Sequence, residues 1–276
     1  MLRTRVLTAV VLLALIAAAA YWSRAALLTL CAALVAVAMG EWLLLAGHRL
    51  APVVLACGAL AGVLVASAVV AFRVPDSAVA IVCAAACALW VGLGLVVVRA
   101  NRAPVVLGRP VSTLLGVIVL VAAWLALVRL LESGVAWLLS AMAVVWVADI
   151  GAYFTGRAIG RRKLAPRVSP GKTWEGVAGA LVGVALIALA ARTLWPQAGL
   201  WSNQLLSKVP LPAALSVLAT VVALSIVGDL FESLLKRQAG VKDSGRLLPG
   251  HGGVLDRIDA TLPALPAAAL IDWWIR

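Results

Sequence analysis

The feature that most constrains this chain is a succession of nine apolar stretches, each close to the length of a membrane-spanning helix. They cover residues 6–23, 25–47, 51–72, 77–98, 110–128, 133–155, 174–195, 211–231 and 259–275. A helix needs about 20 apolar residues to cross the hydrocarbon core of a bilayer. Nine crossings therefore account for most of the 276 residues, and we expect an all-α integral membrane protein, a polytopic bundle of about nine transmembrane helices.

The composition excludes the main alternatives to such a bundle. Hydrophobic residues make up 64% of the chain and charged residues 12%, whereas soluble proteins are about 45–50% apolar and about 25% charged. A porin-like barrel would alternate apolar and polar residues along each strand, but here the charges gather between continuous apolar runs. The net charge of +12 indicates membrane topology and anionic headgroups, and we expect membrane lipid rather than nucleic acid as a partner.

The distribution of Lys and Arg predicts the orientation of the helices. With nine crossings, 17 basic residues fall on the side of the N-terminus and six on the other side. Cytoplasmic loops carry the excess of basic residues, so we expect the N-terminus and the loops after the sixth and eighth stretches in the cytoplasm. In this orientation the C-terminus would lie on the outer side of the membrane. We expect a multi-pass protein of the cell inner (plasma) membrane. The Arg-rich, Ala-rich composition is typical of a GC-rich bacterial genome.

The chain divides into two parts by chemistry. Residues 1–148 contain three acids and read as N-terminal transmembrane scaffold helices, whereas residues 149–259 hold seven of the 11 acids and the two largest basic loops. We therefore expect the functional part in residues 149–276, with its polar loops at the cytoplasmic face. No linker separates the two parts, so they form one continuous membrane domain.

Acids, bases and glycines crowd into residues 228–259. Asp229 falls near the cytoplasmic end of the eighth stretch, where an ionised carboxylate is costly unless a cation or water meets it. Asp256 and Asp259 are three residues apart and share a helix face if the ninth helix has begun by then. Carboxylates that converge from two helices form an oxygen-rich site, which suits Mg²⁺. Alternatively, the acids form ordinary salt bridges with the basic residues of the segment, namely Lys236, Arg237, Lys242 and Arg257.

His251 follows Pro249 and Gly250 and precedes Gly252 and Gly253. Such a backbone turns sharply and exposes N–H groups to an anion. We therefore expect His251 and the two following glycines to contact phosphate, although a lone histidine is more often a structural hydrogen-bonding residue.

A second polar cluster covers residues 149–176, and its GKT at 171–173 invites comparison with a P-loop. The required glycine five positions earlier is absent, because Pro166 stands there. We also expect no strand before Gly171, which a P-loop would need. A P-loop is therefore excluded.

We expect instead a basic loop that enters the seventh helix. Ser169, Lys172 and Thr173 would donate to phosphate oxygens near the N-terminus of that helix. The alternative is a basic anchor for the cytoplasmic face, which accounts for Arg161 and Arg162 but not for Ser169.

Residues 233–259 resemble the C-terminal motif of the phosphatidate cytidylyltransferases, also called CDP-diacylglycerol synthases. The matching residues are Ser233, Lys236, Arg237, Lys242, Asp243, Pro249, His251, Gly252, Gly253, Asp256, Arg257 and Asp259. A dozen identities over 27 residues are far more specific than a short glycine motif. Residues 169–176 and the Gly228–Asp229 pair are also similar to that family, so the resemblance covers residues 149–259.

The resemblance implies a nucleotidyltransferase of phospholipid biosynthesis. Family members join CTP and phosphatidate into CDP-diacylglycerol and pyrophosphate with Mg²⁺, and the lipid phosphate attacks the α-phosphorus of CTP in line. The family also implies a two-cation centre, with a second ion that is monovalent or divalent. Asp229 and Asp256 match its carboxylates. Asp149, Asp243 and Asp259 are weaker candidates.

The resemblance also implies roles for the other polar residues, which are expected at phosphate groups. Lys236, Arg237 and His251 join the two carboxylates as catalytic candidates. The substrate-binding candidates are Ser169, Lys172, Thr173, Ser233, Lys242, Arg257, Gly252 and Gly253. A monomer and a homodimer are both left open.

Two other functions remain as alternatives. An ion-coupled membrane transporter would use Asp149 and Asp229 as ion or proton stations. Its polar groups should mark a path across the membrane, whereas here they collect on one face. Another CTP-using lipid enzyme, such as a polyprenol kinase, would have similar phosphate chemistry and a different acceptor.

Overall fold

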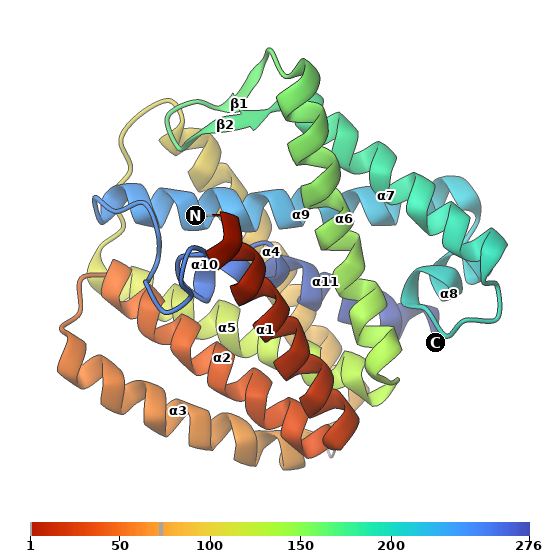
Figure 1. Ribbon diagram of the computed structural model, residues 1–276, viewed down its shortest axis with the longest axis horizontal. Coiled ribbons are helices and arrows are strands. Elements are labelled where there is room, and N and C mark those ends of the chain that lie inside the picture. Colours follow the sequence, from red (N-terminus) through yellow and green to blue (C-terminus); the bar gives the residue numbers. More distant parts are fainter. Residues whose placement is uncertain (1, 72–73) are drawn as a thin grey trace.

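The computed structural model describes residues 2–71 and 74–276, without the side chains of residues 2–6, 9 and 67–71. The long helices are α1 (Leu2–Trp22), α2 (Arg24–Leu45), α3 (Leu50–Ala71), α4 (Asp76–Ala100), α5 (Arg109–Glu132), α6 (Val135–Ile159), α7 (Trp174–Leu194) and α9 (Leu211–Gln238) (Figure 1). The shorter elements are β1 (Lys163–Ala165), β2 (Ser169–Thr173), α8 (Trp201–Lys208), α10 (Leu255–Ile258) and α11 (Thr261–Ile275).

The prediction of a helical membrane protein is confirmed. Within the described residues, α2, α4, α5, α6, α7 and α9 are the six helices long and apolar enough to cross a membrane. The other three predicted stretches fall on α1, α3 and α11. With 15 residues, α11 is about 22 Å long, shorter than the roughly 30 Å of a hydrocarbon core. The count of nine spans is therefore approximate.

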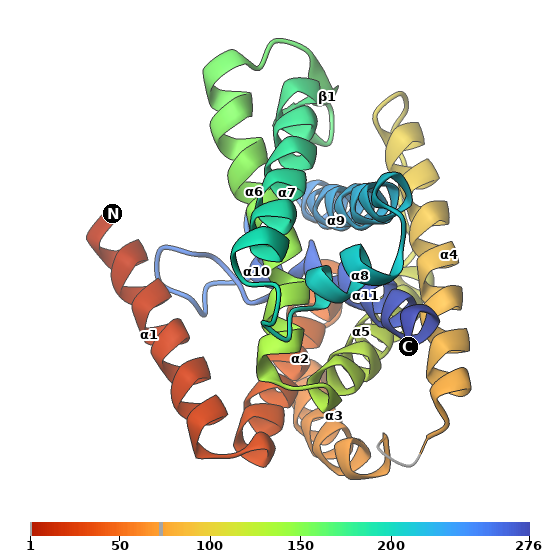
Figure 2. The same ribbon diagram turned by 90° about the vertical axis from the view of Figure 1, so that its right-hand side faces the viewer.

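The short helix α11 lies in the centre of the bundle, where it packs against α4, α5 and α9 (Figure 2). Eleven of its 15 residues are buried. Because its neighbours shield it from lipid, α11 does not need the length of a lipid-exposed spanning helix. Its N-terminal end follows α10 closely, so the polar segment before it is held over the middle of the bundle.

A buried aromatic cluster fixes α9 against the N-terminal helices. The ring of Phe231 lies 6.0 Å from the ring of Trp42 on α2 and 6.0 Å from that of Trp90 on α4, measured between centroids. The indole of Trp42 also donates to the carbonyl of Ser112 on α5 at 2.8 Å. These contacts hold the C-terminal half of α9, which carries Asp229, in a fixed position in the bundle.

Loops that are predicted on the same side of the membrane lie at the same end of the bundle. At one end, the Gln238 side chain exchanges hydrogen bonds with the main chain of Leu107. At the other end, Arg276 donates to Ser133 and lies near Asp76. The chain therefore alternates between two ends as expected, while the assignment of one end to the cytoplasm stays a prediction.

Residues 163–173 form an antiparallel β-hairpin, so the expectation that no strand precedes Gly171 is wrong. Lys163 pairs with Thr173 and Ala165 pairs with Ser169. Strand β2 leads directly into α7, where the Thr173 hydroxyl accepts the N–H of Gly176 as an N-cap. Strands this short, with Pro170 and Gly171 inside one of them, carry no alternation of apolar and polar residues that sequence reasoning could detect.

Candidate active site

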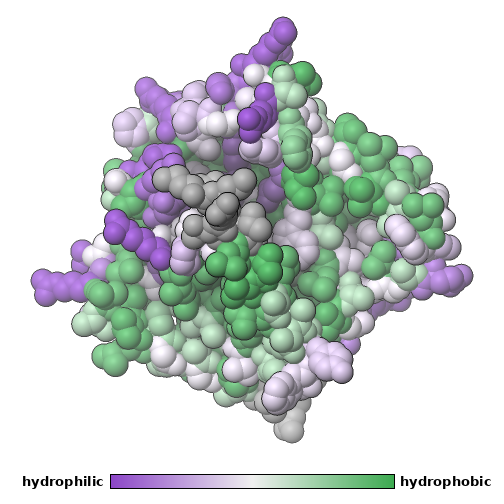
Figure 3. All heavy atoms as spheres, viewed as in Figure 1, coloured by the Kyte–Doolittle hydropathy of each residue, from purple (hydrophilic) through white to green (hydrophobic). Residues whose placement is uncertain are grey.

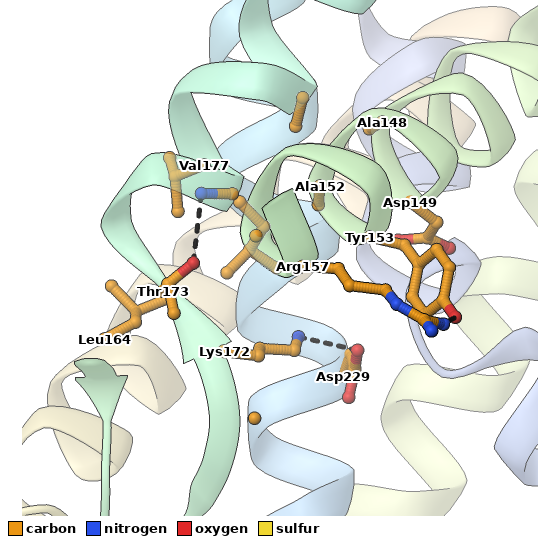
Figure 4. Close-up of a pocket in the computed structure, with 15 residues that line it drawn as sticks. Ala148, Asp149, Ala152, Tyr153, Arg157, Leu164, Lys172, Thr173, Val177 and Asp229 are labelled. Atoms are coloured by element: carbon orange, nitrogen blue, oxygen red, sulfur yellow. Dashed lines mark hydrogen bonds and ion pairs between the residues drawn. The ribbon is translucent and has the colours of Figure 1, made fainter. Parts of the chain in front are cut away.

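A cavity of about 550 Å³ lies between α6, β2, α7 and α9 (Figure 4). We call it the α6–α7 cavity. Its polar lining residues are Asp149, Tyr153, Arg157, Lys172, Thr173 and Asp229, and most of the others are apolar or glycine. Tyr153, Phe154 and Trp174 are exposed beside it, and such aromatic side chains favour the membrane interface. The cavity thus combines charged groups with an apolar wall.

Glycines allow α6 and α7 to approach closely beside this cavity. A Cβ atom on Gly179 would lie 2.1 Å from the hydroxyl oxygen of Thr155, and one on Gly151 would lie 2.7 Å from the carbonyl oxygen of Gly179. Neither position has room for a side chain. This close packing sets the distance between Asp149 and Tyr153 on α6 and the hairpin that enters α7.

Lys172 and Asp229 face one another across the cavity (Figure 4). The ammonium nitrogen lies 2.6 Å from Oδ2 of the carboxylate, and the two side chains are 24% and 32% exposed. The Ser233 hydroxyl donates to Oδ1 of Asp229 at 3.4 Å, one turn along α9. The structure therefore brings together three sequence-predicted residues, and it leaves their charges accessible from the cavity.

Further charges surround this ion pair. Asp229 interacts electrostatically with Asp149 on α6 and with Asp259, which follows α10. Lys172 and Arg257 offset the charge of Asp149. Three carboxylates thus share one region, and their mutual repulsion would be relieved by a cation.

Arg157 is a cavity-lining cation that the sequence analysis does not single out. Its guanidinium donates to the Tyr153 hydroxyl at 2.7 Å and lies 6.0 Å from the centre of that ring (Figure 4). Among the described residues it forms no salt bridge with a carboxylate. Arg157 is therefore available to pair with an anionic ligand.

The second part of the site is the loop of residues 242–257, in which Lys236 of α9, two main-chain N–H groups and the nearby Ser244 hydroxyl surround the Asp256 carboxylate. Lys236 Nζ donates to Oδ1 at 2.6 Å. The N–H groups of Ser244 and Gly253 donate to Oδ2 at 2.9 and 2.8 Å, and the Ser244 hydroxyl lies 3.0 Å away. Burial raises the pKa of Asp256, but these hydrogen bonds outweigh it and lower the pKa to about 2. Asp256 is therefore ionised and ties the loop together.

Lys236 lies between two carboxylates. Its ammonium group pairs with Glu232, one turn earlier on α9, as well as with Asp256. Glu232 is 1% exposed, and a carboxylate so deeply buried needs a cation beside it. The alternative interpretation, in which the acids of residues 228–259 form salt bridges with the basic residues, therefore holds for Lys236. Its charge stabilises two buried carboxylates of the site.

A cavity of about 540 Å³ lies over the loop, and we call it the polar cavity. Its charged and imidazole side chains are Lys242, Asp243, Arg246, His251 and Arg257. Gly250 and Gly252 in its wall have φ angles of +77° and +85°, which other residues rarely adopt. The glycines next to His251 are thus required by the turn.

The basic groups of the polar cavity have no acid within salt-bridge distance among the described residues. In the part of the chain that the structure describes, Lys242, Arg246 and Arg257 form no salt bridge. The buried Nδ1 atom of His251 likewise has no hydrogen-bond partner among the described residues. The three basic side chains suit a polyanion such as a phosphate chain.

The five carboxylates predicted as cation ligands do not converge on one point. Within the described residues, no group of three or more His, Cys, Asp or Glu side chains is close enough to hold a metal ion. Asp229 lines the α6–α7 cavity together with Asp149, Asp256 lies in the loop network, and Asp243 lines the polar cavity. Asp259 accepts the N–H of Ala260.

The remaining predicted residues have local partners. Ser169 pairs with Ala165 in the hairpin, and the Thr173 hydroxyl is occupied as the cap of α7. Arg237 donates to the carbonyl of Val168 in the hairpin turn at 3.5 Å. This contact joins the end of α9 to the hairpin.

Sequence reasoning misses Glu41, Glu232 and Arg157. Glu41 on α2 accepts the main-chain N–H groups of Val254 and Leu255, so the first 148 residues contribute directly to the loop. The position of Glu41 could have indicated its importance. An ionised acid inside an apolar membrane-spanning stretch costs free energy, so such a residue is a candidate functional residue.

Comparison with known proteins adds independent findings. Residues 3–273 match the model of the Cytidylyltransferase family. The chain is 41% identical over 278 residues to the phosphatidate cytidylyltransferase of Pseudomonas aeruginosa, an alignment that covers 99% of this chain and 97% of the relative. It is 47% identical over 133 residues to the enzyme of that name from Haemophilus influenzae, covering 48% of this chain and 44% of the relative. For the Bacillus subtilis enzyme the identity is 44% over 138 residues, covering 49% and 46%.

Proposed function

Because the chain belongs to the cytidylyltransferase family, we propose that it is a phosphatidate cytidylyltransferase, which converts CTP and phosphatidate into CDP-diacylglycerol and pyrophosphate. The observation that carries this proposal is the 41% identity to an enzyme of that name over 99% of the chain. The predicted membership of the family is thereby confirmed, and the enzyme is a nucleotidyltransferase of phospholipid biosynthesis.

The reaction requires no nucleophilic side chain. A phosphate oxygen of phosphatidate attacks the α-phosphorus of CTP, and the bond from that phosphorus to the oxygen that bridges to the β-phosphate breaks, so that pyrophosphate leaves. Catalysis then rests on positioning and on neutralising the phosphate charges. Both cavities offer positive groups for this purpose.

The two cavities suit the two substrates. The α6–α7 cavity has an apolar wall and exposed aromatic neighbours, and it presents Arg157 and Lys172, which fits a phosphate group attached to acyl chains. The polar cavity presents Lys242, Arg246 and Arg257, which fits the triphosphate of CTP. In this proposal Lys172 exchanges its ion pair with Asp229 for the lipid phosphate.

Asp229 offers hard carboxylate oxygens of the kind that Mg²⁺ prefers, and Asp149 and Asp259 add negative charge near it, although among the described residues no three such side chains are close enough to hold the ion by themselves. We propose that Asp229 holds the ion, with Asp149 and Asp259 beside it. Asp256 is the second proposed ligand, since its Oδ1 accepts one hydrogen bond and keeps a lone pair. When bound, Mg²⁺ neutralises charge on the phosphate oxygens.

The distribution of polar residues disfavours the transporter. On the face that Figure 3 presents, hydrophilic residues gather mainly toward the end that carries the hairpin, and the lower part is mostly hydrophobic. Intramembrane ion stations would extend across the bundle instead. The polyprenol kinase is disfavoured by the full-length match to phosphatidate cytidylyltransferase.

Two labels on CTP separate the three functions. With phosphatidate and Mg²⁺ in detergent, we expect a label on the α-phosphate to enter the lipid and a label on the γ-phosphate to appear in pyrophosphate. A kinase would move the γ-label to the lipid, and a transporter would consume no CTP. Diacylglycerol, which lacks the phosphate nucleophile, is the control acceptor and should receive no label. Transfer of the γ-label to any lipid would overturn the proposal.

We further propose that both cavities face the cytoplasm of a bacterial inner membrane, where CTP is available. Single cysteines at the exposed positions of Ala103 and Gln197, in a chain whose four native cysteines are replaced, test this orientation. In intact cells whose outer membrane has been permeabilised, an impermeant maleimide should label position 197 and should reach position 103 only after the inner membrane is opened. The reverse labelling would contradict the topology.

A further inference from the structure

Glu41 is a buried acid near the C-terminal end of the apolar helix α2, and it is 6% exposed. Its carboxylate accepts hydrogen bonds from the loop that follows α9, more than 200 residues away in the sequence. Oε1 accepts the N–H of Val254 at 3.0 Å, and Oε2 accepts the N–H of Leu255 at 2.7 Å and the Ser244 hydroxyl at 3.0 Å. Both oxygens are thus used to hold one segment.

Two glycines make room for this carboxylate. A Cβ atom on Gly245 would lie 2.3 Å from Oε1 of Glu41, and one on Gly253 would lie 2.4 Å from Oε2. Atoms this close would overlap, so either the loop or Glu41 would have to move. The loop is therefore built around the Glu41 side chain.

Ser244 connects Glu41 to Asp256. Its hydroxyl lies 3.0 Å from an oxygen of each carboxylate, and its main-chain N–H donates to Asp256. A change at Glu41 would therefore displace the Asp256 carboxylate. Lys242 and Arg246, which line the polar cavity, lie two residues from Ser244 along the chain, one on each side.

We propose that Glu41 is a positioning residue for cytidylyl transfer: it contacts no reacting atom but fixes the loop that carries Asp256 and the polar cavity. The inference rests on the proposed function for the identity of the reaction. It assigns an active-site task to the N-terminal half, which composition alone marks as scaffold. Since α2 packs against α3 and α5 and buries mainly apolar residues, we expect the fold to survive the removal of this carboxylate.

Glu41→Gln tests the position of the loop without reference to activity. Glutamine keeps the shape, but its NH₂ group would face a main-chain N–H or the Ser244 hydroxyl, so at least one donor loses its acceptor. By hydrogen exchange of the detergent-solubilised protein, we expect the amides of Val254 and Leu255 to exchange at least about tenfold faster, with the exchange of α5 unchanged. Unchanged exchange at both amides would overturn the inference.

Steady-state kinetics then test whether the position matters for catalysis. We expect Glu41→Gln to lower kcat at least about tenfold, with a KM for phosphatidate within about threefold of the wild type. The thermal midpoint should stay close to that of the wild type. The matched control is Glu132→Gln, an acid of the same half that pairs with Arg129 at the other end of the bundle and should leave kcat unchanged. Equal kcat values for wild type and Glu41→Gln would overturn the inference.

Gly245→Ala provides a second route if Glu41→Gln folds poorly. The new Cβ atom would collide with Glu41, so the single variant Gly245→Ala should lose activity. In a chain that already carries Glu41→Ala, the collision is gone, so adding Gly245→Ala should lower the activity little further. Additive losses would contradict the contact. If the wild-type protein formed no CDP-diacylglycerol, the proposed function and the catalytic part of the inference would both be wrong. The hydrogen-exchange result would still decide whether Glu41 positions the loop.

Discussion

The α6–α7 cavity and the 242–257 loop hold their charges in opposite ways. In the cavity, Lys172 and Asp229 form one ion pair whose side chains are 24% and 32% exposed. In the loop, the side chain of Asp256 is 5% exposed and has four donors around it. Separating a pair that is as accessible to solvent as Lys172 and Asp229 should cost about 1 kcal/mol, whereas removing one partner of a buried pair costs about 3–5 kcal/mol.

This difference indicates a division of labour. A charge that a ligand is to displace must be held weakly, as Lys172 is. A charge that shapes the site must be held tightly, as Asp256 and Lys236 are. We therefore expect substitutions in the loop to affect both folding and turnover, and substitutions in the cavity to affect turnover alone.

The largest effect is expected for Asp256→Ala. The change removes the acceptor of two main-chain N–H groups and leaves Lys236 with Glu232 as its acid partner. Turnover should be lost, and the free energy of unfolding should fall by about 3 kcal/mol, the lower end for a buried pair because one partner remains. Thermal melting and CDP-diacylglycerol formation measure the two effects. Asp243→Ala, in the same loop but exposed, should leave the melting midpoint unchanged. A wild-type midpoint for Asp256→Ala would contradict the comparison.

Asp229→Ala should reduce turnover by about 10²–10³-fold and leave stability within about 1 kcal/mol of the wild type. The pair it breaks is partly exposed, and the freed Lys172 can be solvated in the cavity. The same melting and turnover assays apply. Near-native turnover in Mg²⁺ would remove Asp229 from the proposed metal site, and a large loss of stability would erase the distinction between cavity and loop.

Lys172→Gln and Arg237→Gln should each lower kcat/KM about thirtyfold, or about 2 kcal/mol, if these cations contact phosphate in a partly dehydrated site. A general membrane anchor would contribute only about 1 kcal/mol of nonspecific attraction to anionic lipid. Arg162→Gln, an exposed change outside both cavities, serves as the control. Equal small losses in all three variants at matched lipid composition would favour the anchor.

The helices were predictable because an apolar stretch of membrane-spanning length has few other stable conformations. The position of α11 could not be predicted, because its 15 residues are as apolar as those of a membrane-spanning helix. Only the helices packed around it show that it is a short central helix. The β-hairpin was missed for a related reason, since its few residues carry no period. The local sequence pattern predicts which helices form, whereas the packing of the helices decides how deeply each one is buried.

The part of the candidate site that comes from one continuous segment of the sequence could be predicted. Lys236, His251 and Asp256 lie within a short, unusual motif, so their proximity could be expected. Glu41 lies more than 200 residues from its partners Val254 and Leu255, and no local pattern connects them. Nor does the motif tell which cation is buried: the structure assigns that place to Lys236 and leaves Arg257 unpaired within the described residues.

The smallest effect, and the most selective, is expected for Arg157→Gln. Arg157 is exposed at the α6–α7 cavity and rests on Tyr153 instead of an acid, so it can pair with a lipid phosphate without breaking a salt bridge. Losing one such exposed pair should raise the KM for phosphatidate about fivefold, equivalent to about 1 kcal/mol, without changing the KM for CTP. Kinetics in mixed micelles, with the lipid mole fraction and CTP varied separately, measure both constants. Arg161→Gln, four residues further along the chain, after the end of α6 and outside the cavity, should change neither. A rise in the KM for CTP, or equal changes in the two variants, would mean that the α6–α7 cavity does not bind the lipid phosphate.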